Sequence, residues 1–269
     1  MSGVLAIEGL TVAYGSAPVV RDISMTLASG EVLGLVGESG SGKSTLGMAV
    51  LGLLDPAACI DAGTIMLDDE DLLQMAPVKR RKLCGSTIAL IPQEPMTSLN
   101  PTLRIGRQID LVLRHHRKDD TGTRRRLAED ALASVMIADP PRILSSFPFQ
   151  LSGGQLQRVL IAIAFALGPR LIIADEPTTA LDMSAQGAVL DLLVSRAREE
   201  GASVLLISHN LPLVRRYSDR VAVMQRGEIV EQGAANKVLT TPEHLYTAAL
   251  IAALPANTPS RTPLPVPDA

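Results

Sequence analysis

The stretch Glu31-Val-Leu-Gly-Leu-Val-Gly37 runs directly into Glu38-Ser-Gly-Ser-Gly-Lys43-Ser44. Its first part is a short apolar run that follows a turn, which is typical of a buried strand, and residues 43–54 follow a helical pattern. Strand, glycine-rich loop and helix, in that order, are the context in which the motif G-x-x-x-x-G-K-[ST] binds phosphate. The sequence therefore predicts a phosphate-binding loop, or P-loop, at residues 37–45. The alternative is a flexible Gly/Ser loop.

Each part of this loop has a role in holding a nucleotide. Its glycines let the backbone curl so that successive N–H groups point at phosphate oxygens, and the helix that follows adds its positive end. We expect Lys43 to neutralise the β- and γ-phosphates and the Ser44 hydroxyl to bind Mg²⁺. The predicted ligands are ATP and Mg²⁺, and the predicted nucleotide-binding residues are Gly37, Glu38, Ser39, Gly40, Ser41, Gly42, Lys43, Ser44 and Thr45.

Two carboxylates end a second apolar segment, Leu171-Ile-Ile-Ala-Asp175, which is followed by Glu176. P-loop proteins need a second acidic group for the metal, at the end of a neighbouring buried strand. We expect Asp175 to bind Mg²⁺ and Glu176 to orient or deprotonate the attacking water. An Asp-Glu pair that only ends a strand is the alternative, and the preceding P-loop argues against it.

The segments on either side predict an α/β protein with a P-loop NTPase core. Residues 4–14 and 19–27 predict an antiparallel β edge subdomain, whereas strands are absent from about 94 to 165, where arginine-containing helical stretches predict an inserted α-helical subdomain. Strands resume at residues 171–175 and 203–208, separated by a helix, so a mixed sheet with parallel strands is expected. We predict one ATPase domain over residues 1–254 and a proline-rich disordered tail over 255–269.

Composition excludes several classes of protein. The chain has 269 residues, of which 46% are hydrophobic, enough for a sizeable core. Its formal charge of -3 gives no general attraction for nucleic acid, and no nucleic-acid partner is expected. Two cysteines, Cys59 and Cys84, are too few for a disulfide framework and suit a reducing compartment. The longest apolar run, residues 159–168, is half of what a bilayer-spanning helix needs, and no secretory signal begins the chain.

One further segment narrows the class of P-loop protein. Leu151-Ser-Gly-Gly-Gln155, with Gln157-Arg158 after it and Asp175-Glu176 about 20 residues later, resembles the signature of ABC-type ATPases. In that family the signature of one subunit closes over ATP held by the P-loop of another. A Ser-Gly-Gly turn that opens a helix suits this role because it offers a hydroxyl and N–H groups to a phosphate, although an ordinary helix cap is the alternative. The resemblance implies nucleotide contacts from Ser152, Gly153, Gly154 and Gln155.

The same resemblance implies roles for four residues elsewhere in the chain. Gln93, in Ile91-Pro-Gln-Glu-Pro95, is similar to the glutamine that reaches Mg²⁺ and the nucleophilic water. His209, at a predicted strand end, is similar to the switch histidine that contacts the γ-phosphate. Asp182 matches the D-loop, which crosses the dimer interface, and Tyr14 matches the aromatic residue that stacks on adenine. Glu176, His209 and Gln93 are thus the expected catalytic residues, and Ser44, Gln93 and Asp175 the expected metal ligands.

Two stretches resemble the oligopeptide, dipeptide and nickel importer branch: residues 94–101 and residues 242–250, the latter with Tyr246-Thr247. The branch implies two integral membrane permease subunits, a second ATPase subunit, identical or paralogous, and an extracytoplasmic solute-binding protein. Many members carry a later cysteine cluster for an iron–sulfur centre, and because no cysteine follows Cys84 we expect none here. Leu245 also stands where a proline commonly precedes the tyrosine.

The expected function is therefore that of an ATPase subunit that couples ATP binding and hydrolysis to peptide uptake, peripheral on the cytoplasmic face of the inner membrane. A nickel or other small-solute importer is the first alternative. A soluble ABC-type ATPase without a membrane partner is the second, although neither a repeated nucleotide domain nor a heptad run is present. A regulatory module that binds ATP without hydrolysing it is disfavoured by Glu176 and His209.

Overall fold

The computed structural model describes residues 4–179, 181 and 183–254. They fall into two compact units. The first unit contains the described residues up to Met75 and from Leu205 onward, and the second contains those from Ala76 to Val204. The predicted tail at 255–269 lies outside the described residues. Within the described part of the chain, no helix has both the length and the apolarity needed to cross a membrane.

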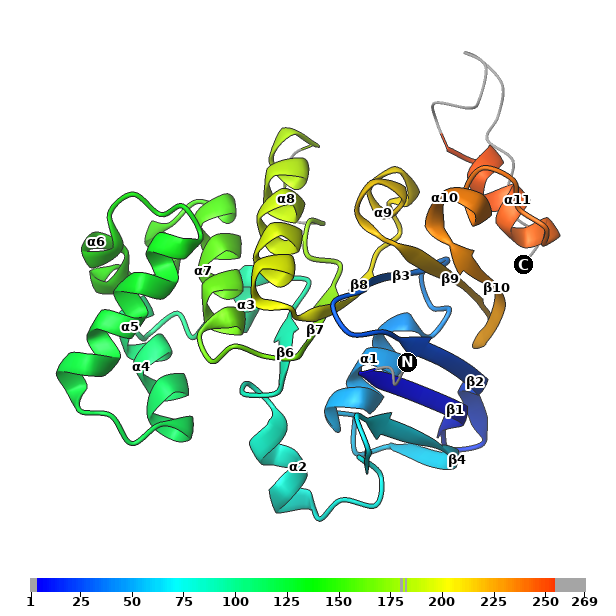
Figure 1. Cartoon of the computed structure of the whole chain (residues 1–269), viewed down its shortest axis with the longest axis horizontal. Helices are drawn as coiled ribbons and strands as arrows, with labels where there is room; N and C mark the ends of the chain where they lie inside the picture. Colours follow the sequence, from blue (N-terminus) through cyan, green and yellow to red (C-terminus); the bar gives the residue numbers. More distant parts are fainter. Residues whose placement is uncertain (1–3, 180, 182, 255–269) are drawn as a thin grey trace. The chain divides into compact units, whose positions relative to one another are not determined.

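An antiparallel sheet forms one part of the first unit, as the sequence predicts (Figure 1). Its strand order is β2-β1-β4-β5, with β1 at Leu5–Tyr14, β2 at Ala17–Leu27, β4 at Ala58–Leu67 and β5 at Glu70–Asp71. Strand β4 was not predicted. Its first half carries small and polar residues and is largely exposed, so it lacks the apolar alternation that marks a strand. Its exposed first half is a strand because it pairs with β1.

A mixed sheet forms the other part of the first unit, in the order β10-β9-β3-β8. Strand β3 runs parallel to β9, and β9 runs antiparallel to β10. All residues of β3 and β8 are buried, which is consistent with the apolar sequence of β3 and of residues 204–207. The strands and helices of this part are β3 (Val32–Val36), α1 (Lys43–Leu51), β8 (Ser203–Ile207), α9 (Leu211–Tyr217), β9 (Arg220–Gln225), β10 (Glu228–Ala234), α10 (Ala235–Val238) and α11 (Leu245–Ala252).

The second unit consists mainly of helices. Its two strands, β6 and β7, pair in parallel, and α7 packs on β6. Figure 1 shows α4, α5 and α6 (green) gathered beside α7. The apolar run at 159–168 belongs to α7 and its end, where it is mostly buried. The elements are α2 (Pro77–Leu83), β6 (Ile88–Ile91), α3 (Pro95–Ser98), α4 (Ile105–His116), α5 (Thr121–Ser134), α6 (Pro140–Ser145), the short 3-10 helix η1 (Pro148–Gln150), α7 (Gly153–Phe165), β7 (Leu171–Asp175) and α8 (Met183–Glu200).

These findings confirm the predicted fold class: a mixed sheet, an antiparallel sheet and a set of helices between β6 and β7. The predicted helix at 123–137 begins at Thr121 and ends at Ser134. Asp120 caps its start by accepting a hydrogen bond from the Thr123 N–H group. The helix stops early because Met136 has a positive φ of 58°, which no helical residue adopts.

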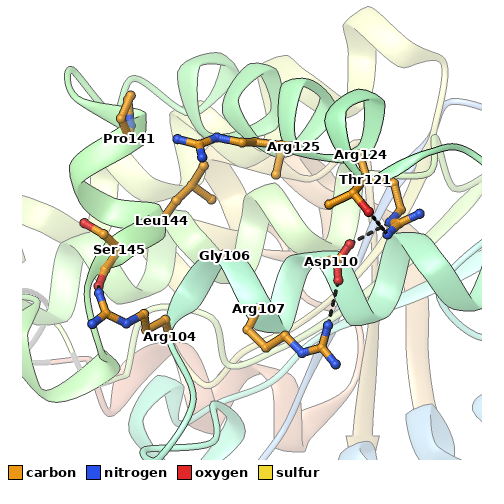
Figure 2. Close-up of a pocket in the computed structure, with 11 residues that line it drawn as sticks. Arg104, Gly106, Arg107, Asp110, Thr121, Arg124, Arg125, Pro141, Leu144 and Ser145 are labelled. Carbon is orange, nitrogen blue, oxygen red and sulfur yellow. Dashed lines mark hydrogen bonds and ion pairs between the residues drawn. The ribbon is translucent and has the colours of Figure 1, made fainter.

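Asp110 joins helices α4 and α5 of the second unit. Its carboxylate accepts hydrogen bonds from Arg107 Nη1 at 2.9 Å and from Arg124 Nε at 2.6 Å (Figure 2). The Arg124 hydrogen bond, supported by the charges of both arginines, holds the pKa of Asp110 below its usual range. The three side chains border a pocket of about 300 Å³ between α4, α5 and α6, which no predicted nucleotide-binding residue lines.

Asp110→Asn should lower the free energy of unfolding by about 1 kcal/mol at neutral pH, because it removes two charge-assisted hydrogen bonds. A carboxylate with a lowered folded pKa stabilises the protein above its unfolded pKa, and this stabilisation is lost as the pH falls through the folded value. The difference between the two proteins in denaturant titrations should therefore shrink on acidification below about pH 4.

The control for this experiment is Glu129→Gln. Glu129 pairs with Arg125 on the surface of α5 at 3.0 Å, where Arg125 is 69% exposed. Such exposed pairs contribute little to stability. Equal effects of the two substitutions at neutral pH would contradict the role given to Asp110.

Candidate functional site

The P-loop lies in the first unit, between the end of β3 at Val36 and the start of α1 at Lys43. Gly37 has a φ of +151°, and a Cβ there would collide with the carbonyl oxygen of Met224. Gly42 has a φ of +102°, and its Cβ would lie 2.6 Å from the Val19 carbonyl oxygen. Only glycine fits either position, because both the backbone angle and the space exclude a side chain. The loop is thus shaped by its neighbours as well as by its sequence.

Lys43 fixes the inner side of the loop. Its side chain is only 5% exposed, and Nζ donates to the carbonyl oxygens of Gly37 at 2.9 Å and Glu38 at 2.7 Å, and to Ser41 Oγ at 3.3 Å. An ammonium group can be buried only if such oxygens replace water around it. The loop therefore holds a positive charge among its own backbone groups.

The start of α1 makes the same place suitable for an anion. The first N–H groups of a helix have no acceptor within the helix, and its N-terminus carries a partial positive charge. The first turn of α1 contains no acidic residue that would compete for them. The predicted residues Glu38, Ser39, Gly40 and Ser44 are exposed and Thr45 is half-buried, so the outer side of the loop is open to a phosphate group.

His209 lies at the same edge of the mixed sheet as the P-loop. It follows β8, which is next to β3, and the neighbouring Ser208 N–H group donates to the Leu35 carbonyl oxygen at 3.1 Å. His209 is exposed. The next residue, Asn210, caps α9 by accepting a hydrogen bond from the Leu213 N–H group, so the chain direction after the histidine is fixed.

Tyr14 ends β1, and its ring is 37% exposed. It pairs with Ala17 at the start of β2. Val19, two residues further along β2, is the residue whose carbonyl oxygen closes around Gly42. The tyrosine therefore lies on a hairpin that contacts the P-loop, and an exposed aromatic face there can stack on a base.

Two predicted catalytic residues meet in the second unit. β6 and β7 are parallel, with Ile91 opposite Ala174, so the residues that follow both strands lie at one edge. There Gln93 Nε2 donates to Glu176 Oε2 at 3.2 Å. Asp175, the last residue of β7, is 7% exposed. Gln93 and Glu176 are thus neighbours in space, although they are 83 positions apart in the sequence.

Glu176 is held in an unusual conformation. Its φ is +46°, in the left-handed region that residues with a side chain rarely adopt. Thr179 Oγ1 donates to Glu176 Oε2 at 2.8 Å, the oxygen that also accepts from Gln93. Sequence reasoning did not single out Thr179, and its position three residues after Glu176 was the available signal. Two donors on one oxygen fix the carboxylate and leave its other oxygen in a defined direction.

The Ser152 turn opens α7 in the second unit. Ser152 Oγ accepts from the Gln155 N–H group at 3.3 Å, and Gln155 Oε1 accepts from the Ser152 N–H group at 3.0 Å. This reciprocal pair is a capping box. Ser152 and Gly153 are exposed, and a Cβ on Gly154 would meet nothing within 4 Å. The turn is therefore both a helix cap and an accessible surface.

The predicted site residues thus form two groups, one in each unit. The first unit carries the P-loop, Tyr14 and His209, and the second carries Gln93, Asp175, Glu176 and the Ser152 turn. Asp182 lies outside the described residues. A further contact of the P-loop was not predicted: the Glu38 N–H group donates to the Tyr246 hydroxyl on α11.

Comparisons of the sequence with a family model and with curated proteins agree on one family. Residues 20–179 match the family model described as ABC transporter. The dipeptide transport ATP-binding protein DppD of Escherichia coli (strain K12) is 43% identical over 255 residues, which cover 93% of this chain and 78% of that protein. The oligopeptide transport ATP-binding protein OppD of Lactococcus lactis subsp. cremoris (strain SK11) is 43% identical over 88% of this chain and 70% of that protein.

Solved structures show the same relationship. The structure of a post-hydrolysis state of the ATP-binding cassette MJ0796, a dimer bound to ADP and Pi, has a TM-score of 0.76 at 25% identity, covering 86% of this chain and 99% of that one. The structure of cbiO1 from Clostridium perfringens, part of the transporter complex cbiONQ, has a TM-score of 0.78 at 26% identity, covering 90% and 93%. With the family model and the sequence relatives, they show that this chain belongs to the ABC transporter family and is one of its ATPases.

Proposed function

We propose that this chain is the ATP-hydrolysing subunit of an importer that takes up peptides across the cytoplasmic membrane. The observation that carries the proposal is the P-loop closed around the buried Lys43, in a chain that is similar over 93% of its length to a dipeptide transport ATP-binding protein. Several other relatives are named for dipeptide or oligopeptide transport. Peptide is therefore the substrate class that we favour over nickel.

Nucleotide binding is assigned to the first unit. Tyr14 stacks on the adenine ring, and residues 37–45 surround the phosphates with N–H groups. Lys43 exchanges part of its hydrogen bonding from the loop oxygens to the β- and γ-phosphates. His209, beside the end of β3, donates to the γ-phosphate. The nucleotide thereby replaces loop contacts of the lysine with stronger, charge-assisted ones.

The predicted metal ligands suit Mg²⁺ chemically. Ser44 offers a hydroxyl, Asp175 a carboxylate and Gln93 an amide carbonyl, and Mg²⁺ prefers such oxygen donors together with substrate phosphates. Because Gln93 uses its Nε2 group toward Glu176, its Oε1 atom remains oriented away from that carboxylate. When bound, Mg²⁺ would neutralise charge on the phosphate oxygens.

Glu176 is assigned the role of general base. Gln93 and Thr179 both donate to its Oε2 atom and so orient the carboxylate, which accepts a proton from the water that attacks the γ-phosphate. Asp175 is buried at the end of the same strand and keeps the adjoining backbone in place. The reaction releases phosphate and ADP, and Glu176 returns its proton to solvent or to the product phosphate.

A second ATPase subunit, identical or paralogous, completes each proposed site. Its Ser152 turn presents a hydroxyl and a helix N-terminus to the γ-phosphate, and its Asp182 contributes to the interface. ATP therefore holds two subunits together, and hydrolysis weakens the contact. A ligand that binds the closed state more tightly shifts the population toward it, which is how binding energy can drive a transport step.

The remaining partners that we propose are two integral membrane permease subunits and an extracytoplasmic solute-binding protein, and we propose no nucleic-acid partner. The chain would then be a peripheral subunit on the cytoplasmic face of the inner membrane. Co-purification with integral membrane proteins, followed by peptide uptake in reconstituted vesicles, tests this assignment. If the reconstituted complex hydrolysed ATP and took up nickel but not peptides, the substrate would be nickel and the peptide assignment would be wrong.

Lys43→Ala should weaken ATP binding by a factor of roughly 10 to 100, because a charge-assisted contact with phosphate is removed. An equilibrium titration of the full chain with ATP measures the effect. Lys237→Ala is the control, since Lys237 forms an ion pair with Glu243 on an exposed surface. An unchanged affinity in folded Lys43→Ala protein would exclude the P-loop as the binding site.

Glu176→Gln should leave nucleotide affinity nearly unchanged and lower the hydrolysis rate by a factor of roughly 10² to 10⁴, because the amide keeps the shape of the side chain but cannot accept the proton. Phosphate release at saturating ATP measures the rate. Glu94→Gln, which neutralises an exposed carboxylate close to Gln93, should hydrolyse ATP normally. Wild-type turnover in Glu176→Gln would contradict the role of Glu176.

Ser152→Asp should abolish ATP-dependent pairing of subunits, because it places a carboxylate opposite the triphosphate while keeping a good N-cap residue. Ser152→Asn is the matched control, since it caps equally well without charge. Size-exclusion chromatography of both variants, each combined with Glu176→Gln to retain ATP, measures pairing. ADP affinity should be equal in both, and pairing of Ser152→Asp at the wild-type level would disprove the contact.

A further inference from the structure

Helix α11 of the first unit reaches the beginning of the P-loop. The backbone N–H group of Glu38 donates to the hydroxyl oxygen of Tyr246 at 3.1 Å, although the two residues are 208 positions apart. Tyr246 is only 5% exposed. A buried hydroxyl that accepts a backbone N–H group is a specific contact, because the donor would otherwise lose its hydrogen bond.

The Tyr246 side chain is fixed by apolar packing. It belongs to a buried cluster that includes Val36 of β3, Leu211 and Val214 of α9, and Val238 of α10. Val36 is the residue immediately before Gly37, so the tyrosine packs against the strand end from which the loop emerges. The ring therefore cannot move away from the loop without disturbing the core of the first unit.

Polar contacts fix the start of α11 as well. The Glu231 carboxylate on β10 accepts hydrogen bonds from the N–H groups of Glu243 at 2.9 Å and His244 at 3.2 Å. His244 Nδ1 then accepts from the Tyr246 N–H group at 3.2 Å, as a side-chain cap. The position of the tyrosine thus depends on the strand as well as on the helix.

The N–H and carbonyl groups of Glu38 both form hydrogen bonds that shape the P-loop. The Glu38 carbonyl oxygen accepts from Lys43 Nζ at 2.7 Å and from the Ser41 N–H group at 3.2 Å. The Glu38 N–H group faces the other way, toward Tyr246. Removing the Tyr246 hydroxyl would leave this N–H group without its acceptor. The first turn of the loop could then rotate, and the carbonyl oxygens that accept from Lys43 would shift.

We propose that Tyr246 is a positioning residue for nucleotide binding, whose hydroxyl holds the Glu38 backbone so that the P-loop is formed before the phosphates arrive. The inference rests on the proposed function of this loop. A loop that is competent only part of the time binds its ligand more weakly by that fraction. Helix α11 therefore influences the affinity of a site whose predicted nucleotide-binding residues lie in other elements.

The test is Tyr246→Phe in the full chain, titrated with ADP, which lacks the γ-phosphate that the partner's Ser152 turn is proposed to contact. The substitution keeps the ring and its packing and removes only the hydroxyl, so we expect roughly five-fold weaker ADP binding. Thr247→Val is the matched control. It removes another buried hydroxyl from α11, one that lies near Glu231 and not near the loop.

Thermal unfolding without nucleotide separates positioning from general stability. The unfolding temperature of each variant without nucleotide is the reference, and a fixed ADP concentration should raise it less for Tyr246→Phe than for Thr247→Val. Equal ADP affinity in Tyr246→Phe, Thr247→Val and the wild type would overturn the inference. If Lys43→Ala also binds ADP normally, the proposed function of the loop fails as well; if Lys43→Ala alone loses binding, only the inference about Tyr246 fails.

Discussion

The hydrogen bonds of the Lys43 ammonium group are the interaction on which the P-loop of this protein depends. A buried ammonium requires oxygens around it, and the chain supplies two backbone carbonyls and a serine hydroxyl. To present them, the backbone must turn sharply at Gly37 and Gly42, at places where neighbouring strands leave no room for a Cβ. The glycines and the surrounding strands therefore shape the loop that holds the ammonium group of Lys43, and this group supplies the positive charge for phosphate binding.

The second unit holds a negatively charged group, the carboxylate of Glu176, in a fixed orientation. Glu176 is fixed through a single oxygen by Gln93 and Thr179, and it follows a fully buried strand. Both of these donors are uncharged groups, and together they fix the direction of the carboxylate. The two proposed centres thus use hydrogen bonds of opposite direction: Lys43 donates to carbonyl and hydroxyl oxygens, whereas Glu176 accepts from an amide and a hydroxyl group.

Much of the fold and of the candidate site could be predicted from the sequence, because the patterns that mark these elements span only a few neighbouring residues. Three features show this: the apolar run before Gly37, the carboxylates at Asp175 and Glu176, and the Ser152 cap. In each, a periodic pattern of apolar residues lies next to a residue type that begins or ends a strand or helix. Strand β4 could not be predicted, since its first half is exposed and its strand character comes from pairing with β1. The bond between Glu38 and Tyr246 joins distant segments, and only the packing of α11 reveals it. Leu245 is the first residue of α11 and is 87% exposed, a position at which proline would also fit.

The left-handed backbone of Glu176 has a consequence for how this protein can change over time. A side chain in that region costs of order 1 kcal/mol, and glycine or asparagine would adopt it more readily. For stability alone, glycine or asparagine would therefore suit this position better than glutamate. Under the proposed function, the glutamate lowers stability at the position where it supports hydrolysis, so a replacement there would exchange catalysis for stability.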